Sequence, residues 1–162
     1  MNVSDTGAEY LETFMDKFLF RVKRGYSYSA DDLWIRVEGE QARIGVTDFL
    51  QRLSGDVAFV KFATPGDNLR KEQSLAEIET MKATVDIPAP FDGILAESNE
   101  ALDERPELLN EDPYGEGWLV TMKPAGDLAI QGLLDADAYF ELMKEKLAEE
   151  DKKRQAQGGG ND

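Results

Sequence analysis

Short apolar segments separated by turn residues fill the middle of the chain, and this pattern limits the fold to an assembly of small strands. The connections contain glycine, proline or aspartate, as at 65–67 and 92–93. Such segments are typical of antiparallel strands joined by tight turns. We therefore expect a mainly β fold, a flattened barrel or sandwich of short antiparallel strands. The segments are residues 33–37, 42–46, 57–62, 75–80, 94–97 and 118–122.

One short helix is expected among these strands. Thr47 can begin it, because a threonine hydroxyl accepts a hydrogen bond from a free amide in the first helical turn. Gly55 is placed to end it, because glycine readily adopts the conformation that follows a helix. The sequence therefore predicts a helix between these two residues.

Residues 75–87 predict a hairpin with a lysine at its turn. Apolar residues on either side of Glu79-Thr80-Met81-Lys82-Ala83-Thr84 change between odd and even positions, so one straight strand would place some of them in water. The chain is therefore expected to turn at Met81-Lys82. A two-residue turn normally uses glycine or asparagine, and we interpret the unusual turn as a sequence that an enzyme reads. Taken alone, Lys82 fits an ordinary exposed lysine in a turn, which is by far the commonest state of lysine on protein surfaces.

This tip resembles the swinging-arm hairpin of lipoyl and biotinyl domains, in which a ligase attaches the cofactor to the ε-amine of the tip lysine. Lysine suits that role, because its amine forms a stable amide at the end of a flexible stem. The tip alone is ambiguous between the two cofactors. Met81 resembles a biotin site, Ala83 resembles a lipoyl site, and Glu79 fits either.

Further blocks of the chain are similar, in type and order, to the glycine cleavage H-protein family. The most distinctive is Pro106–Leu119, which biotinyl domains lack, and the resemblance covers roughly residues 26–148. It implies that Lys82 is a lipoyl-lysine. The other blocks are residues 44–49, 53–57, 90–93 and 99–102.

The resemblance implies a carrier that is not itself an enzyme, with lipoic acid as its covalent cofactor. It implies recognition of the tip through Glu79, Met81 and Ala83. The implied partners are a lipoylating enzyme, a pyridoxal-phosphate glycine decarboxylase, a tetrahydrofolate-dependent aminomethyltransferase and dihydrolipoamide dehydrogenase. Such a carrier shuttles an aminomethyl group and electrons between them. Within the distinctive block, Tyr114, Gly115, Gly117 and Trp118 are expected to support the fold, with the glycines in a turn and Trp118 in the core.

Three departures from the family pattern keep other functions open. The chain has Asp31-Asp32-Leu33-Trp34 where a Glu-His-Glu-Trp-like block is usual, Met81 where valine is usual, and an additional N-terminal segment. H-protein-like lipoate-binding proteins also serve bacterial sulfur oxidation with a heterodisulfide-reductase-like complex. A biotin carrier and an unmodified acidic interaction module are the remaining alternatives.

Composition excludes several other classes of function. The chain contains no cysteine and no histidine, which removes disulfides, thiol nucleophiles and the commonest general base and metal ligand. Asp103, Glu104 and Asp112 lack the ligand spacing of an EF-hand. A formal charge of −15 argues against nucleic acid and anionic membranes as partners. With no membrane-length apolar run and no secretion signal, we expect a cytoplasmic protein.

The two ends of the chain are expected to form additions to this domain. Residues 9–22 have apolar positions at helical spacing, which predicts an amphipathic helix ending near Gly25 in an extension over 1–25. The carrier domain then covers 26–132, and a C-terminal helix over 133–150 is capped by Asp135 or Asp137. Residues 151–162, in a tail that is highly charged from Glu149 and ends Gly158-Gly159-Gly160-Asn161-Asp162, are expected to be disordered.

Overall fold

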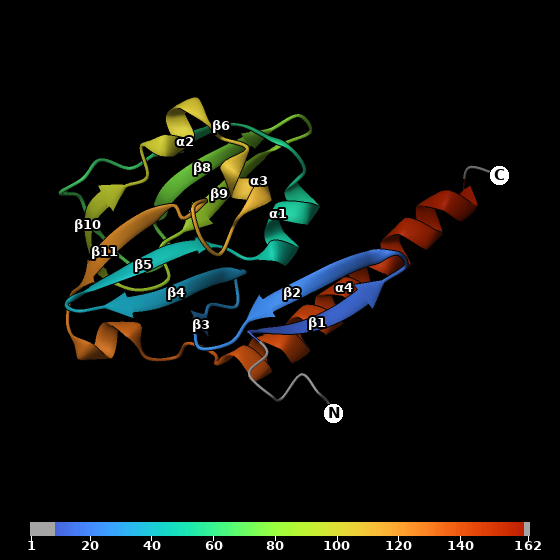
Figure 1. Ribbon diagram of the computed structural model, residues 1–162, viewed down its shortest axis with the longest axis horizontal. Helices are drawn as coiled ribbons and strands as arrows, with labels where there is room; N and C mark the ends of the chain where they lie inside the picture. The colour runs from blue at the N-terminus through green and yellow to red at the C-terminus, as the bar shows by residue number, and fades with distance from the viewer. Residues whose placement is uncertain (1–8, 161–162) are drawn as a thin grey trace.

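The computed structural model describes residues 9–160, and within them the fold is mainly antiparallel β (Figure 1). Six strands form the larger sheet in the order β3-β4-β5-β11-β10-β7, and three form a second sheet in the order β6-β8-β9. The first sheet contains β3 (Ser27–Tyr28), β4 (Leu33–Glu38), β5 (Gln41–Val46), β11 (Val120–Pro124), β10 (Gly93–Ser98) and β7 (Asn68–Leu69). The second contains β6 (Val57–Phe62), β8 (Ser74–Thr80) and β9 (Thr84–Pro88).

The two sheets enclose an apolar core, so the predicted sandwich is confirmed as an open one. Alternate residues of a strand face opposite sides, and the inward residues of both sheets are buried. On β4, Leu33 and Ile35 face this core while Trp34 faces a second cluster on the other side. Burial of these aliphatic side chains supplies the main favourable term for folding. Fully buried members of the core include Leu33, Ile35, Ile44, Leu75, Ile78, Ile87 and Leu95.

The short helix α1 (Asp48–Ser54) confirms the predicted caps. The Thr47 hydroxyl accepts from the Leu50 amide, and the Gly55 amide donates to the Gln51 carbonyl. Gly55 takes φ +86°, a conformation that favours glycine. Further short helices are α2 (Ala101–Glu104), α3 (Leu108–Glu111) and the 3₁₀ helix η2 (Asp127–Ile130).

The predicted N-terminal helix is wrong, because residues 9–22 lie in a two-stranded hairpin. Strands β1 (Tyr10–Met15) and β2 (Phe18–Lys23) pair antiparallel and turn at Asp16-Lys17, where Asp16 takes φ +55°. Gly25, expected to end a helix, lies in the turn after β2. Figure 1 shows this hairpin lying along the C-terminal helix, away from the sandwich.

Mirror symmetry about the turn explains the error. Leu11 pairs with Val22 and Met15 with Phe18, so apolar positions fall at intervals of four, three and four along the chain. A helix with one apolar face gives the same intervals. The aromatic and β-branched content of these residues was the better guide, since such side chains favour strands.

The C-terminal helix α4 (Ala136–Gly160) covers the inner face of the hairpin. The Asp135 carboxylate accepts from the Ala138 amide, which confirms one of the two expected caps. On this helix Tyr139 and Met143 are buried, whereas Leu142 is only half-buried. The helix, the hairpin and the outer face of β4 share the second apolar cluster, whose fully buried members are Val22, Tyr28, Trp34, Tyr139 and Met143.

The expected disorder of residues 151–162 is also wrong for the part that the structure describes, because α4 continues through Gly160. Ion pairs with three-residue spacing support this extension, including Lys153 with Glu150 at 3.5 Å and Arg154 with Asp151 at 2.8 Å. Such pairs join neighbouring positions on a helix surface. Arg154 also pairs with Asp16 at the turn of the β1–β2 hairpin. Residues 161–162 lie outside the described chain.

Candidate functional site

The predicted hairpin around Lys82 is present, and it turns where the sequence indicated. Strands β8 and β9 pair antiparallel, with Glu79 opposite Thr84. The Thr80 amide donates to the Ala83 carbonyl at 2.9 Å, which leaves Met81 and Lys82 as the loop. The lysine therefore lies at the end of two paired strands whose inward residues are fixed in the sandwich core.

Thr80 explains how the tip turns without glycine or asparagine. Its hydroxyl oxygen accepts from the Ala83 amide at 3.1 Å and from the Lys82 amide at 3.3 Å, and the hydroxyl lies 3.2 Å from the Ala83 carbonyl oxygen. Neither Met81 nor Lys82 takes a positive φ. Sequence reasoning missed this residue. The available signal was a hydroxyl residue directly before the loop, where its side chain can bond local backbone amides.

The four residues singled out at the tip are all exposed. Glu79, Lys82 and Ala83 face solvent, and the side chain of Met81 is 84% exposed. Within residues 9–160 no carboxylate forms an ion pair with Lys82. An ε-amine in this position is accessible to an enzyme and available for amide formation, and the exposed Met81 gives the tip an apolar feature beside it.

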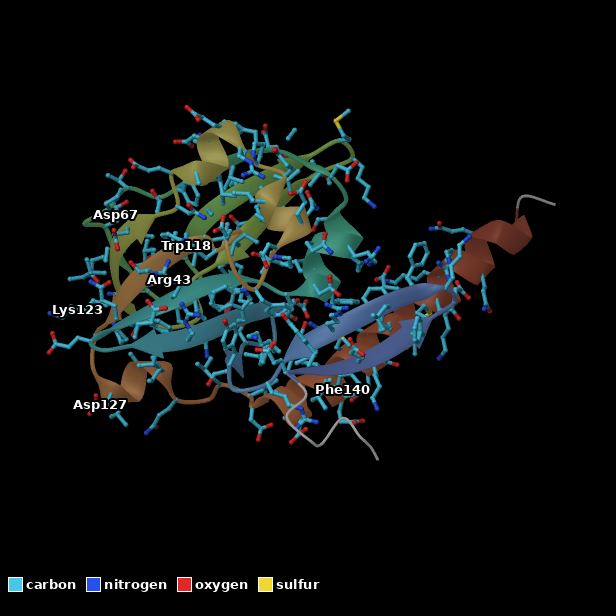
Figure 2. All side chains as sticks on the ribbon, in the orientation of Figure 1. Arg43, Asp67, Trp118, Lys123, Asp127 and Phe140 are labelled. Atoms are coloured by element: carbon cyan, nitrogen blue, oxygen red, sulfur yellow. The ribbon has the colours of Figure 1, made fainter. Side chains whose placement is uncertain are left out.

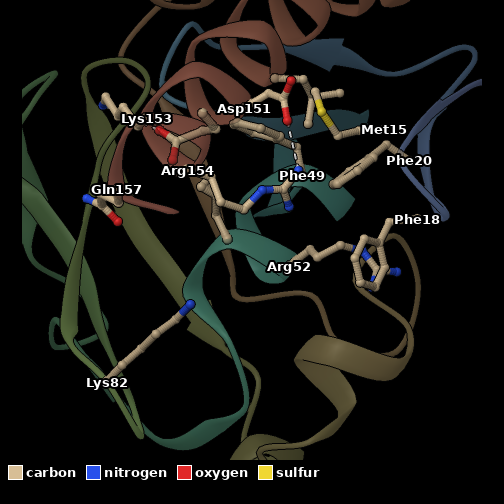
Figure 3. Close-up of a pocket in the computed structure, with 13 residues that line it drawn as sticks. Met15, Phe18, Phe20, Phe49, Arg52, Lys82, Asp151, Lys153, Arg154 and Gln157 are labelled. Carbon is tan, nitrogen blue, oxygen red and sulfur yellow. Dashed lines mark hydrogen bonds and ion pairs between the residues drawn. The ribbon is translucent and has the colours of Figure 1, made fainter. Parts of the chain in front are cut away.

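The stem of Lys82 crosses the end of α1. A Cβ atom placed on Gly55 would lie 3.0 Å from Cε of Lys82 and 3.8 Å from Nζ. The absence of a side chain at Gly55 therefore leaves room for the lysine stem. Figure 3 shows Lys82 leaving the hairpin and pointing toward α1.

A hollow of about 450 Å³ lies beside this lysine, between α1, the β1–β2 hairpin and the end of α4 (Figure 3). Apolar side chains form most of its inner surface: Met15, Phe18, Phe20, Phe49, Leu53 and Leu147. Charged side chains stand at its rim: Arg52, Lys82, Glu150, Asp151, Lys153 and Arg154.

At this rim, Arg52 lies over two aromatic rings of β2. Its guanidinium carbon lies 5.4 Å from the ring centre of Phe18 and 5.5 Å from that of Phe20. These distances fit a cation–π contact. The contact joins α1 to β2 at the edge of the hollow.

The part of the distinctive block that follows α3 stabilises the fold at a distance from Lys82. The Tyr114 hydroxyl donates to the Arg21 carbonyl at 2.6 Å and accepts from the Asp48 amide at 3.3 Å, and burial raises the pKa of this hydroxyl well above its usual value. Trp118 is only half-buried, under the Arg43 guanidinium at 4.2 Å, and Figure 2 shows these two side chains together. The expectation that Trp118 fills the core holds only in part, because Trp34 occupies the buried position.

The glycines of this block are explained by close packing. A Cβ on Gly115 would lie 2.5 Å from Oδ2 of Asp112, and one on Gly117 would lie 2.4 Å from the Leu108 carbonyl oxygen. Neither glycine takes a positive φ. Close approach of neighbouring groups, rather than turn flexibility, therefore explains these two glycines.

Two kinds of site are absent from residues 9–160. No group of three or more acidic side chains there is arranged to hold a metal ion. No helix in the same span is both long enough and apolar enough to cross a membrane.

An open antiparallel sandwich that presents a lysine on a rigid hairpin has the architecture of a carrier domain. A family model described as glycine cleavage H-protein matches residues 26–146. The chain therefore belongs to the glycine cleavage H-protein family. Proteins of this family are non-catalytic carriers with lipoic acid attached covalently to a lysine.

Individual relatives agree with this family. A glycine cleavage system H protein of Bacteroides thetaiotaomicron is 48% identical over 112 residues, which cover 69% of this chain and 89% of the relative. One from Bacillus subtilis is 35% identical over 124 residues, which cover 76% of this chain and 98% of the relative. The crystal structure of a glycine cleavage system H protein from Mycobacterium marinum superposes with a TM-score of 0.64 at 33% identity, covering 70% of this chain and 92% of that one.

Proposed function

We propose that Lys82 is the lysine that carries the lipoyl group, and that the protein acts as the mobile-arm carrier of a glycine cleavage system. Its position at the tip of the β8–β9 hairpin, exposed and free of a carboxylate partner among the described residues, is the observation that carries the proposal. An accessible amine on a rigid support fits a prosthetic group joined through an amide. When bound, the lipoyl dithiolane supplies a disulfide. One of its sulfur atoms takes up a carbon unit, and the disulfide accepts the electrons of that transfer.

The residues of this chain then have distinct parts in presenting the arm. Strands β8 and β9 fix the direction of the tip, and Thr80 holds the loop backbone. Lys82 contributes the flexible stem, and Gly55 leaves space for it. A tether of this kind keeps its end at a high effective concentration around the carrier, so a docked partner meets the arm as a local reactant.

The carrier would visit the enzymes of the glycine cleavage system in turn. It would receive an aminomethyl group at a glycine decarboxylase, present it to an aminomethyltransferase and be reoxidised by dihydrolipoamide dehydrogenase, after a lipoylating enzyme has modified it. Relatives named as H proteins of this system support that pathway over sulfur oxidation with a heterodisulfide-reductase-like complex. We propose that Glu79, Met81 and Ala83 give the lipoylating enzyme and partners a recognisable tip.

Intact-mass measurement of protein from its native host tests the attachment site. We expect a lipoyl increment that Lys82→Arg abolishes. Lys61→Arg is the matched control, because Lys61 is an exposed lysine on β6 of the same sheet, and it should keep the increment. A biotin increment, or none, would contradict the proposal.

Loading with an aminomethyl group tests the pathway separately. Fully lipoylated protein, incubated with the cognate glycine decarboxylase and glycine, should gain the mass of the aminomethyl group. A lipoylated sample that never gains it would remove glycine cleavage as the function while leaving the attachment site intact.

A further inference from the structure

The outer edge of strand β1 has no partner strand among the described residues. β1 pairs only with β2, in a two-stranded sheet that runs for six residues without a register shift. Figure 1 shows β2 on the side of this hairpin toward the sandwich and β1 on the side away from it. An unpaired strand edge offers a row of free amides and carbonyls to another strand. The β1 edge is therefore a candidate interaction surface, and it precedes the residues that the family model matches.

The hydrogen-bond pattern of the hairpin determines which groups of β1 point outward. The Arg24 amide donates to the Glu9 carbonyl at 2.8 Å, and hydrogen-bonded pairs alternate with non-hydrogen-bonded pairs along an antiparallel ladder. Residues 11, 13 and 15 therefore bond to β2, and the backbone groups of Tyr10, Glu12 and Phe14 point outward. Within residues 9–160 these outward groups make no hydrogen bond.

Side chains close the opposite edge of the same hairpin. The Arg21 amide donates to Oδ2 of Asp48 at 3.0 Å, and the Arg21 carbonyl accepts from the Tyr114 hydroxyl at 2.6 Å. The Lys23 carbonyl accepts from the Tyr28 hydroxyl. The fold thus satisfies the outward backbone groups of β2 and leaves those of β1 open.

Other strand edges of the fold carry features that discourage pairing. β6 has a register shift between Val57 and Phe59, and β9 ends at Pro88. β3 and β7 are only two residues long. Bulges, proline residues and short strands are common ways in which proteins block an edge. In the described part of the chain, β1 is an edge strand with none of these three features.

A second copy of β1 fits this edge in an antiparallel register, with Thr13 of both copies at the two-fold axis. Glu12 of each copy then exchanges hydrogen bonds with Phe14 of the other, through the outward groups of both. Thr13 faces Thr13 in a non-hydrogen-bonded pair, where side chains approach closely and threonine pairs are favourable. The next register toward the start of β1 would place Glu12 opposite Glu12, and like charges directly opposite are unfavourable.

Helix α4 is compatible with such an extended sheet. It packs against both strands of the hairpin, on the face that carries Phe20 and Val22. Thr13 pairs with Phe20 and so belongs to this face, and facing Thr13 residues therefore place both helices on the same side of the sheet. Adjacent strands lie about 4.8 Å apart, so the two helices would lie about 9–10 Å apart. That separation is typical of helices in direct contact, which pack at about 8–10 Å.

We propose that the chain forms a homodimer through β1, with a continuous four-stranded sheet and its two-fold axis at Thr13. The turn of the hairpin lies at the hollow beside Lys82, which Met15 and Phe18 line (Figure 3). Antiparallel pairing directs the two turns away from each other. The two tip lysines therefore lie at opposite ends of the dimer, where each stays accessible.

The absence of cysteine makes the axis directly testable. The chain has no thiol of its own, so Thr13→Cys places one pair of thiols across the axis. The Cα separation of a non-hydrogen-bonded pair, about 4.5 Å, lies within the range of about 4.4–6.8 Å that a disulfide bridges. In a glutathione redox buffer, the full-length Thr13→Cys protein should run mainly as a disulfide-linked dimer on a non-reducing gel. Ala58→Cys is the control, because Ala58 is an exposed residue of the edge strand β6, and it should stay monomeric.

Light scattering with two charge variants tests the interface without a cross-link. The mass of the wild type should approach twice 18.1 kDa as the concentration rises. Phe14→Glu sets a carboxylate opposite Glu12 of the second copy, whereas Phe14→Lys sets an ammonium there. The Phe14 side chain is 69% exposed, so both variants should fold. The dimer Kd of Phe14→Glu should exceed that of Phe14→Lys by about tenfold, because each contact occurs twice across the axis.

Three outcomes would overturn the dimer. The first is a monomeric mass at every concentration, which would leave the β1 edge to a different occupant. The second is equal cross-linking of Thr13→Cys and Ala58→Cys, and the third is an equal Kd for the two Phe14 variants. Protein with and without the lipoyl group should behave alike, so failure of the dimer leaves the proposed function of Lys82 intact.

Discussion

The hydroxyl of Tyr139 donates to Oδ1 of Asp32 at 2.7 Å and thereby joins α4 to the loop before β4. The other carboxylate oxygen of Asp32 accepts from Nζ of Lys146 at 2.9 Å. The Tyr139 hydroxyl also lies 3.0 Å from Oγ1 of Thr47. Asp32, Thr47 and Tyr139 are all buried, so this network fastens the helix through polar contacts inside an otherwise apolar cluster.

We expect Tyr139→Phe to lower the free energy of unfolding by about 1–3 kcal/mol, because it leaves the buried Oδ1 of Asp32 without a partner and leaves the Thr47 hydroxyl with the Leu50 amide alone. Urea unfolding followed by circular dichroism measures the loss. Tyr10→Phe, which removes a hydroxyl with no hydrogen bond among the described residues, should change stability by less than about 0.5 kcal/mol. A neutral Tyr139→Phe would show that the network adds nothing to stability.

Alkaline pH should also weaken the fold, through three tyrosines. Burial raises the pKa of Tyr28, Tyr114 and Tyr139 above the ordinary tyrosine value. A folded-state pKa above the unfolded one contributes stability that is fully present below about pH 10 and is lost as the pH rises further.

Urea unfolding at pH 8, 9, 10 and 11 tests this expectation. The free energy of unfolding should fall above about pH 10, with a smaller fall in Tyr139→Phe, which has one fewer buried phenol. The chain has five tyrosines, so the absorbance difference between wild type and Tyr139→Phe isolates the tyrosinate of Tyr139, which should appear together with unfolding. A difference that rises while the wild type stays folded would contradict the burial of this group.

Thr80→Val should loosen the tip while leaving the sandwich intact. Valine keeps the β-branched shape but cannot accept from the Lys82 and Ala83 amides. Hydrogen exchange at those two amides should quicken by about tenfold, which corresponds to roughly 1.4 kcal/mol of lost protection. We expect lipoylation of Lys82 to slow as well.

Thr84→Val is the control for the tip, because Thr84 is an exposed residue of the same hairpin and makes no hydrogen bond to the loop amides. It should leave both rates unchanged. Unaltered exchange in Thr80→Val would mean that the strands alone determine the turn.

Gly45→Ala should destabilise the larger sheet strongly. Gly45 lies opposite Trp34 on the neighbouring strand, and a Cβ on it would lie 2.5 Å from the indole ring. Trp34 is fully buried and its Nε1 donates to the Pro113 carbonyl at 2.8 Å, so the ring has little freedom to move. Overpacking of this kind costs about 1–3 kcal/mol.

Denaturant unfolding of Gly45→Ala gives the measurement, with Gly126→Ala as the control. Gly126 has an extended backbone and no atom within 4 Å of an added Cβ, so its substitution should be close to neutral. Equal effects of the two substitutions would rule out the ring contact as the reason for the glycine.

The sandwich could be predicted because each of its longer strands carries local information, whereas the two-residue strands β3 and β7 were not predicted. The apolar segments 33–37 and 42–46 indicated β4 and β5, and Thr47 and Gly55 marked both ends of α1. Near Lys82 the apolar residues change between odd and even positions, and this change indicated the hairpin. These signals act over a few residues and depend little on the rest of the fold.

The two ends of the chain were mispredicted because their structure depends on distant partners. The intervals between Leu11 and Val22 fit a helix as well as a hairpin, and packing against α4 favours the hairpin. From the sequence alone, the charged end of α4 is typical of a solvated tail. Its ion pair between Arg154 and Asp16 joins residues 138 positions apart, and no local pattern indicates it. At the site, Thr80 was missed because its role is a side-chain bond to its own loop, which no apolar pattern reveals.

The shared cluster of the hairpin and α4 has a consequence for biosynthesis. Phe20 leaves the ribosome long before Met143, yet both belong to one apolar cluster. A ribosome adds about 5–20 residues per second, so the newly made β1–β2 hairpin exists for seconds before α4 can pack against it. During that interval its apolar face is accessible to chaperones and to other nascent chains. This face becomes buried once α4 has been synthesised.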